Sequence, residues 1–597
     1  MVLIDEMEGS AELTMSMAFA SSGPSGSRPF SAQMFSNPET PIHRVPPEIL
    51  AYILKFLPED AAKLGNFPDC EFNWDIDPRD PDPDMWWNSA RYTSLLQVCR
   101  YWRYTMLTFP SLWNTIIVDS SLPSPRLLVE FFVARSGLLP LRVFATNPDA
   151  FALMAVAEHT GRLQELRVLF TDTSVVAERM SVFNEPAPVL QTLEICYQHP
   201  TVHVDDMGPP HHRSVFLPHL FADTTPQLRY LHLQRIFSWG ENVFPNLTHI
   251  AIQGCETDNV TPQQFFMLLN VLRNSPAVEE FNLIAPHPWV PDFDHLDAFT
   301  PADFDTPIVS LSCLRYLSLI YFAPNQSSFF LSFCDIPRGC HVSISEVAYP
   351  EGGIAASLPE DTSHIGTVQE VTAVSIMQHA IKTAHAIATG PSGSLRISAD
   401  MDVDEPYQPS SGPEDEDALM EEVLYLGPQF HHYSIAPRRW HFNKSYITDL
   451  YIRGPSCDAS VDTHDWVTIL TCLPSLETLV IRKRHTHDIL RGLSAIDDSG
   501  GLPAVSLHFR TLYICNPPTS TLSWPDMVES LRKRRDMGYP FQIFVCQGSR
   551  DRSVDWDDAP DPRDGLMYRE ECRCPSIVVP EEARAKRHDC WLEWPRE

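Results

Sequence analysis

The sequence predicts a protein of mixed α+β and α/β class, in which a small N-terminal helical bundle precedes an irregular solenoid. In that solenoid a curved parallel sheet is backed by helices. Two observations carry the prediction. Apolar residues recur at helical spacing near positions 50 and 100, and short alternating apolar phrases recur between positions 163 and 514. A chain of 597 residues also exceeds what one core uses, so we expect more than one folded unit.

Composition restricts the class of protein. Hydrophobic residues make up 44% and charged residues 20%, and no apolar run reaches the roughly 18 residues of a membrane helix. We therefore expect a protein outside the membrane. Its N-terminus carries acids where an export signal would carry bases, and its 14 cysteines are scattered, which predicts a cytoplasmic or nuclear protein with reduced thiols. The net charge of −33 argues against nucleic-acid binding.

The N-terminal part divides into a tail and a helical unit. Residues 1–40 are rich in Ser, Pro and Gly, and we expect them to be disordered. Residues 41–118 hold a helix that begins at Pro46 and Pro47, an acidic Asp-Pro insertion at about 67–90, and a second helix over 93–107. The second helix is expected to place four apolar residues on one face: Leu95, Cys99, Trp102 and Met106.

The solenoid is predicted over residues 119–348 and 431–547. Its strands are expected in phrases that alternate apolar and polar residues, at intervals near the roughly 20–29 residue unit of leucine-rich repeats. A strand and a helix cannot bury their apolar sides alone, so neighbouring units must stack. The phrases are 163–169, 190–195, 228–233, 247–252, 278–284, 314–320, 447–452, 476–481 and 509–514.

Two segments break this pattern. Residues 349–430 are expected to form an atypical repeat, with a helix over 368–388 and a strand over 395–400, followed by an acidic disordered insertion. Residues 548–597 are Asp- and Pro-rich and predict a loosely held C-terminal tail.

Residues 42–118 resemble an F-box, and especially the F-box proteins that are numerous in mushroom-forming fungi. The motif pieces are VPPEIL followed by apolar residues at helical spacing, then LLQVCRYWR, then FPSLW. The resemblance implies a small helical bundle that docks on a Skp-type adaptor, which binds cullin and RING subunits. The implied contact residues are Val45, Pro46, Pro47, Ile49, Leu50, Ile53 and Leu57, with Leu96, Val98, Cys99 and Trp102 behind or beside them.

A small bundle has too little core to stand alone, so exposed apolar side chains on its helices would be explained by a partner that covers them. The resemblance thus implies a non-catalytic, substrate-recognition adaptor of a cullin-RING ubiquitin ligase. The alternative is a leucine-rich interaction scaffold that takes no part in ubiquitination. In both cases the solenoid would bind an unknown protein target through its inward strand positions. The candidates are Arg229, His232, His249, Arg315, Arg453 and Arg482.

Other signals are weaker. The motifs of P-loop, dinucleotide-binding, serine-hydrolase and zinc-protease enzymes were not found, which favours a protein that is not an enzyme. Cys572, Cys574, His588 and Cys590 match no common zinc spacing, so no metal and no cofactor are predicted. The basic runs at 482–485 and 532–535 are interpreted as a strand end and a helix C-terminus, where cations interact favourably with the helix dipole.

Overall fold

A computed structural model describes the chain in sixteen stretches, and all structural statements below concern these residues. The predicted N-terminal tail, the acidic insertion and most of the C-terminal tail lie outside them. The described residues are 41–64, 89–119, 124–197, 217–236, 242–254, 262–284, 307–322, 324–346, 356–378, 383–400, 443–453, 463–482, 487–495, 507–515, 524–546 and 566–569.

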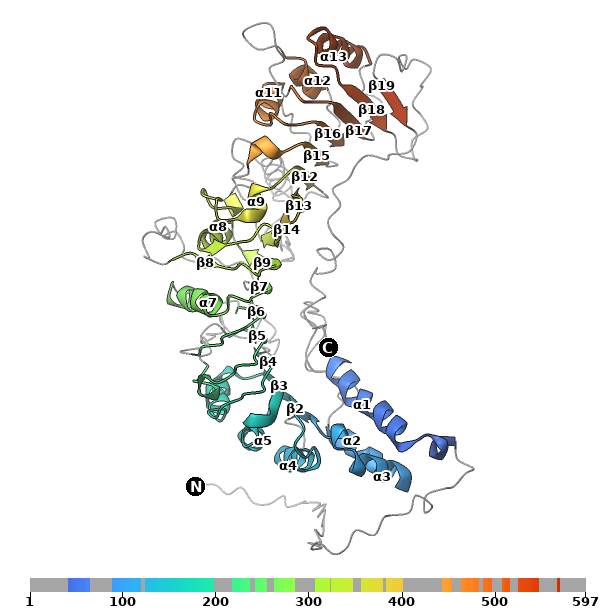
Figure 1. Cartoon of the computed structure of the whole chain (residues 1–597), viewed down its shortest axis with the longest axis vertical. Coiled ribbons are helices and arrows are strands. Elements are labelled where there is room, and N and C mark those ends of the chain that lie inside the picture. Colours follow the sequence, from blue (N-terminus) through green and yellow to red (C-terminus); the bar gives the residue numbers. More distant parts are fainter. Residues whose placement is uncertain are drawn as a thin grey trace, which may run out of the picture.

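A 17-stranded, mostly parallel sheet forms the body of the molecule. Its strands stack along an arc from the N-terminal helices to the C-terminal strands (Figure 1). In spatial order they are β1 (Thr115–Asp119), β2 (Leu141–Thr146), β3 (Leu163–Phe170), β4 (Thr192–Tyr197), β5 (Tyr230–Gln234), β6 (His249–Gln253), β7 (Glu280–Ile284), β9 (Tyr316–Phe322), β11 (His341–Glu346), β14 (Ser394–Asp400), β13 (Thr383–Thr389), β12 (Ala373–Gln378), β15 (Asp449–Arg453), β16 (Thr478–Arg482), β17 (Thr511–Cys515), β18 (Gln542–Cys546) and β19 (Leu566–Arg569).

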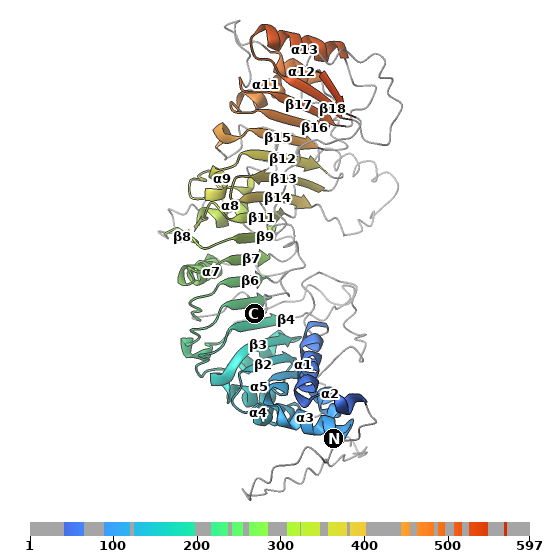
Figure 2. The same ribbon diagram turned by 45° about the vertical axis from the view of Figure 1, so that its right-hand side comes forward.

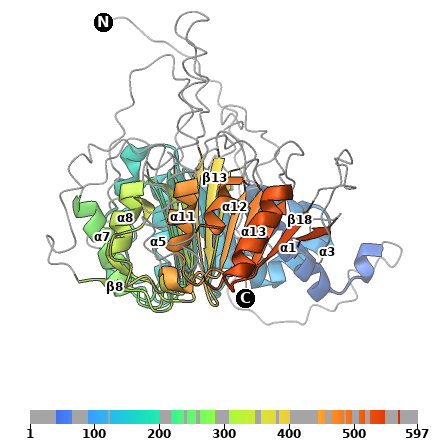
Figure 3. The same ribbon diagram turned by 90° about the horizontal axis from the view of Figure 1, so that it is seen from above.

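Helices follow many of the strands and pack along one side of the sheet (Figure 2). Seen from above, α7 and α8 lie on the side away from α1 and α3 (Figure 3). Two further short strands, β8 (Val309–Ser310) and β10 (Cys334–Asp335), pair with each other. The helices beyond β1 are α4 (Pro125–Arg135), α5 (Ala150–Ala157), α6 (Val176–Met180), α7 (Pro262–Asn274), α8 (Pro324–Ser332), α9 (Gly366–Gln369), α11 (Thr463–Thr471), α12 (His487–Leu493) and α13 (Trp524–Asp536).

Successive residues of each strand point to opposite sides of the sheet, and this explains why an apolar layer lies between the sheet and its helices. In β4, Leu193 and Ile195 are buried in a continuous apolar cluster, and their neighbours Glu194 and Cys196 point to the other side of the sheet. The same cluster holds residues of every strand from β1 to β18 and joins the helices behind them. The parallel sheet backed by helices is thus confirmed, and each of the nine predicted phrases overlaps a strand.

The N-terminal helices meet the sheet at its first strand. They comprise α1 (Pro47–Leu64), α2 (Ser89–Ser94) and α3 (Arg100–Thr108), with short 3₁₀ turns η2 (Pro41–Arg44), η3 (Leu95–Gln97) and η4 (Pro110–Leu112). Leu50 and Leu54 of α1 belong to the same apolar cluster as Ile116 of β1. β1 crosses the boundary predicted at residue 118, so one core connects these helices to the sheet.

The prediction of one continuous helix over 93–107 is wrong. The helical conformation is interrupted at Cys99, whose backbone is extended with φ −158° and ψ 170°, and α3 starts at the next residue. The Cys99 thiol accepts a hydrogen bond from the Trp102 amide at 3.5 Å, which satisfies a donor at the start of α3. A side-chain cap therefore replaces a helical turn at this point.

The helix predicted over 368–388 is also wrong. Only Val368 and Gln369, the last two residues of α9, overlap its start, and the segment continues as β12 and β13, which pair antiparallel. Among the described strands β13 alone runs against the others, since β12 is parallel to β15 and β14 is parallel to β11. Val374 and Ile376 are buried at a spacing of two residues, so pairing in the sheet outweighs the local helix propensity of the Ala-rich text. The strand predicted over 395–400 is confirmed as β14.

Of the predicted C-terminal tail, the structure describes only residues 566–569. They form β19, which pairs in parallel with β18 and extends the sheet.

Trp113 follows η4 and packs against α4 in the apolar cluster that the N-terminal helices share with the sheet, which we call the shared core. Its substitution tests this packing. Its side chain is 0% exposed, its ring contacts Phe131 and Phe132 of α4, and its Nε1 donates to the Met106 carbonyl at 2.7 Å. We expect Trp113→Ala to lower the free energy of unfolding by about 3–5 kcal/mol, measured by urea denaturation. A loss as small as that of Leu138→Ala, whose side chain is 94% exposed, would contradict this packing.

Candidate interaction surface and buried polar site

The exposed side of α1 carries four large apolar side chains, which we call the outer α1 face. Ile49, Tyr52, Ile53 and Phe56 are 51%, 62%, 50% and 42% exposed. Their spacing of three and four residues places them on one side of the helix, opposite the buried Leu50, Ala51 and Leu54. The rings of Tyr52 and Phe56 contact each other edge to face, with centroids 4.9 Å apart. α1 is therefore apolar on two sides, and among the described residues the neighbouring helices and β1 bury only one of them.

The residues implied by the resemblance fall into three groups in the structure. Leu50 is 1% exposed and cannot contact a partner, so its assignment to the contact surface is wrong, because the helix turns this side chain into the shared core. Pro46, Ile49, Ile53 and Val98 are exposed. The half-buried residues are Val45, Pro47, Leu57, Leu96, Cys99 and Trp102.

Some members of the half-buried group have structural roles. Cys99 caps α3, and the Val45 carbonyl accepts a hydrogen bond from the Tyr101 hydroxyl, which fixes the entry to α1 against α3. Sequence reasoning missed Tyr52 and Phe56. Their signal was present, because they follow Ile49 at helical spacing of three and seven residues.

The predicted target-binding residues whose side chains are described differ in position and exposure. Arg229 and Arg315 precede β5 and β9, and Arg229 donates to the Asn246 carbonyl at 3.1 Å, so it holds neighbouring turns together. His232 and His249 do project from the sheet side opposite the helices. His232 is only 7% exposed and contacts Glu194, so its assignment to the target-binding surface is wrong. The side chains of Arg453 and Arg482, in β15 and β16, lie outside the described residues.

A chain of buried charges crosses four neighbouring strands on that same side of the sheet, and we call it the ionic ladder. Arg142 of β2 donates to Glu165 of β3 at 2.7 Å, and Glu165 also accepts from Arg167 at 2.7 Å. Arg167 Nη1 lies 3.2 Å from Glu194 Oε2 on β4, and His232 Nδ1 of β5 lies 3.1 Å from Glu194 Oε1. The ladder contains two carboxylates and two guanidinium groups, so its fixed charges balance.

The ladder controls the ionisation of its carboxylates. Burial alone would raise the pKa of Glu194, but the charge of Arg167 and the hydrogen bond from His232 outweigh it and lower this pKa to about 2. The same balance of burial against Arg167 and Arg142 lowers the pKa of Glu165. Both groups are thus carboxylates at neutral pH, which suits them to hold cations and N–H donors rather than to give up protons.

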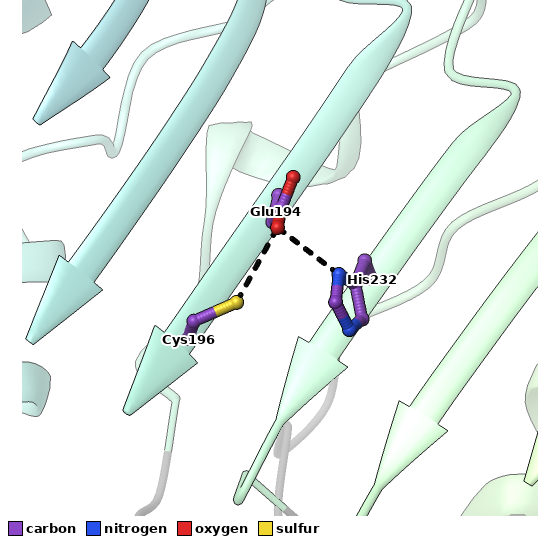
Figure 4. A group of neighbouring side chains, drawn as sticks. All are labelled: Glu194, Cys196 and His232. Carbon is purple, nitrogen blue, oxygen red and sulfur yellow. Dashed lines mark hydrogen bonds and ion pairs between the residues drawn. The ribbon is translucent and has the colours of Figure 1, made fainter. Parts of the chain in front are cut away.

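One group among the described residues has the donors of a metal site. Glu194, Cys196 and His232 are buried, and each offers one ligand atom within 4.8 Å of the others. Glu194 and Cys196 are two residues apart on β4, and His232 is the register partner of Glu194 on β5 (Figure 4). Sequence reasoning missed this group because it depends on register between segments almost forty residues apart. The C-terminal cysteines weighed for zinc lie outside the described residues.

Comparison with protein-family models and with curated proteins found no match for this chain. Within the described residues, no helix combines the length and apolar character needed to cross a membrane.

The ionic ladder is tested by removing one of its cations. Arg167→Met would leave the buried Glu194 without its guanidinium partner, and we expect a loss of about 3–5 kcal/mol in the free energy of unfolding. The matched control is Arg126→Met, since Arg126 pairs with Glu130 at 2.8 Å on the exposed face of α4 and should cost no more than about 0.5 kcal/mol. Equal effects of the two substitutions in urea denaturation would show that the ladder is not buried.

The low pKa of Glu194 predicts an acid dependence of stability. Because the pKa is near 2 in the folded chain and about 4.3 when unfolded, its contribution is complete above the unfolded value and is lost as the pH falls toward 2. Glu194→Gln should therefore reduce the slope of stability against pH between about pH 4.5 and 2, measured by urea midpoints. An unchanged slope would contradict an ionised, paired Glu194.

Proposed function

We propose that this chain is the substrate-recognition adaptor of a cullin-RING ubiquitin ligase, with the outer α1 face docking on a Skp-type adaptor. The observation that carries the proposal is the second apolar side of α1. It coincides with the segment that resembles an F-box, and four large side chains gathered on one side of one helix are what a protein partner would cover.

Exposure of the outer α1 face to water is energetically unfavourable. Isoleucine, tyrosine and phenylalanine side chains each gain on the order of 1.5–3 kcal/mol when fully buried, and about half of each is exposed. The Tyr52–Phe56 ring contact holds two of these side chains in place before binding, which reduces the entropy lost on association. Val98, at 58% exposure, adds an apolar residue just before α3.

The solenoid supplies the second half of the proposed function. Its parallel sheet presents polar and aromatic residues on the side opposite the helices, including Tyr230, His249 and Tyr316 at equivalent strand positions. In this proposal the target protein binds along the sheet, and ubiquitin transfer follows from proximity to the enzyme that the other subunits recruit. No residue of this chain would take part in the chemistry.

A pull-down from cells tests the proposal. The wild-type chain should recover a Skp-type adaptor and cullin, and the double substitution Ile49→Asp with Ile53→Asp should recover neither, because two charges would be buried at the contact. Both side chains are about half exposed, so the folded chain tolerates the change. Leu50→Asp is unsuitable, since it would place a charge in the shared core.

The matched control is Leu127→Asp with Phe151→Asp, two apolar residues 64% and 60% exposed on α4 and α5. This variant should recover both partners as the wild type does. Recovery of adaptor without cullin would favour an interaction scaffold outside ubiquitination. Recovery of neither partner by the wild-type chain would contradict the proposal.

A further inference from the structure

We propose that Glu194, Cys196 and His232 bind a Zn²⁺ ion between β4 and β5. This site is separate from the outer α1 face, and the proposal does not depend on the adaptor function. The three residues are buried on the side of the sheet opposite the helices, and Figure 4 shows Cys196 and His232 both turned toward the Glu194 carboxylate. A thiol, an imidazole and a carboxylate are the ligand types that zinc takes in proteins.

Two of the three distances between the ligand atoms match the edges of a zinc tetrahedron. Bonds of roughly 2.0–2.3 Å at tetrahedral angles place neighbouring ligand atoms about 3.2–3.6 Å apart. Cys196 Sγ lies 3.5 Å from Glu194 Oε1, and His232 Nδ1 lies 3.1 Å from the same oxygen. The remaining separation, between sulfur and imidazole nitrogen, is within 4.8 Å. A side-chain rotation that brings the sulfur and the nitrogen to the length of a tetrahedral edge would complete the ligand set.

The two oxygens of Glu194 have different neighbours, so Arg167 and a zinc ion would not compete for the same oxygen. Arg167 contacts Oε2, at 3.2 Å, and the two other ligands face Oε1. Glu194 can therefore bind the ion through Oε1 and keep Arg167 on Oε2, as ligating carboxylates commonly keep an outer hydrogen-bond partner. Arg142 is held one strand further away by Glu165.

The charges of the ligands suit a dication. Binding releases the Cys196 thiol proton to solvent, and the resulting thiolate offsets one charge of Zn²⁺, while the Glu194 carboxylate is shared between the ion and Arg167 and His232 coordinates as a neutral imidazole. Water would occupy the fourth position. Since Glu194 and His232 are register partners and their side chains already contact each other, the ion would add a metal link between β4 and β5 at this point.

The experiment uses the full chain, freed of metal by a chelator and then titrated with Zn²⁺ alone. Metal content after dialysis gives the stoichiometry, and Co²⁺ in place of Zn²⁺ reports a thiolate ligand through its charge-transfer absorption. We expect the wild-type chain to retain zinc and to show that band. Cys196→Ser should lose the band, and His232→Gln should weaken zinc binding by at least about 10–100-fold.

Two control variants locate the site. Cys515→Ser changes another buried cysteine of the same sheet, on β17, and should bind zinc as the wild type does. Cys572→Ser tests the C-terminal cysteines and should also leave this zinc in place. Zinc lost with Cys572→Ser but kept with His232→Gln would overturn the proposal, as would a wild-type chain that retains no zinc. If Cys196→Ser fails to fold by circular dichroism, His232→Gln alone decides between these outcomes.

Discussion

The apolar layer between the sheet and its helices is the constraint on which the other features depend. A single strand and helix cannot bury their apolar sides alone, so stability comes from stacking neighbours, and one cluster runs from Leu50 in α1 to Val545 in β18. Because α1 contributes Leu50 and Leu54 to this layer, its position and rotation are fixed by the sheet. The same packing that buries these two side chains turns Ile49 and Ile53 outward.

The strands themselves could be predicted because each carries its own alternating pattern. The predicted phrases begin up to two residues early, since the leading leucine, such as Leu190 before β4, lies in the buried turn that precedes the strand. The segment 368–388 failed because alanine-rich text favours a helix locally, and only the neighbours β14 and β15 make it a strand. The break at Cys99 likewise depends on a capping contact that helical spacing does not reveal.

The two candidate sites differed in how much of each could be predicted from the sequence. The outer α1 face is local, so half of it followed from the resemblance, and the error at Leu50 arose because spacing alone does not say which side of a two-sided apolar helix meets the core. The ionic ladder and the zinc ligands are nonlocal. They require Glu194 to stand beside Arg167 on one strand and His232 on another, and this register exists only once the sheet has formed.

The central claim is that the outer α1 face is a protein contact, and site-directed photo-crosslinking tests it most directly. A photoreactive phenylalanine analogue at position 52, which is 62% exposed on α1, should form a covalent adduct with a purified Skp-type adaptor. The same analogue at position 151, which is 60% exposed on α5, should form none. An adduct at position 52 alone is the predicted result. Adducts at position 151 but not at 52, or at neither position, would contradict the claim.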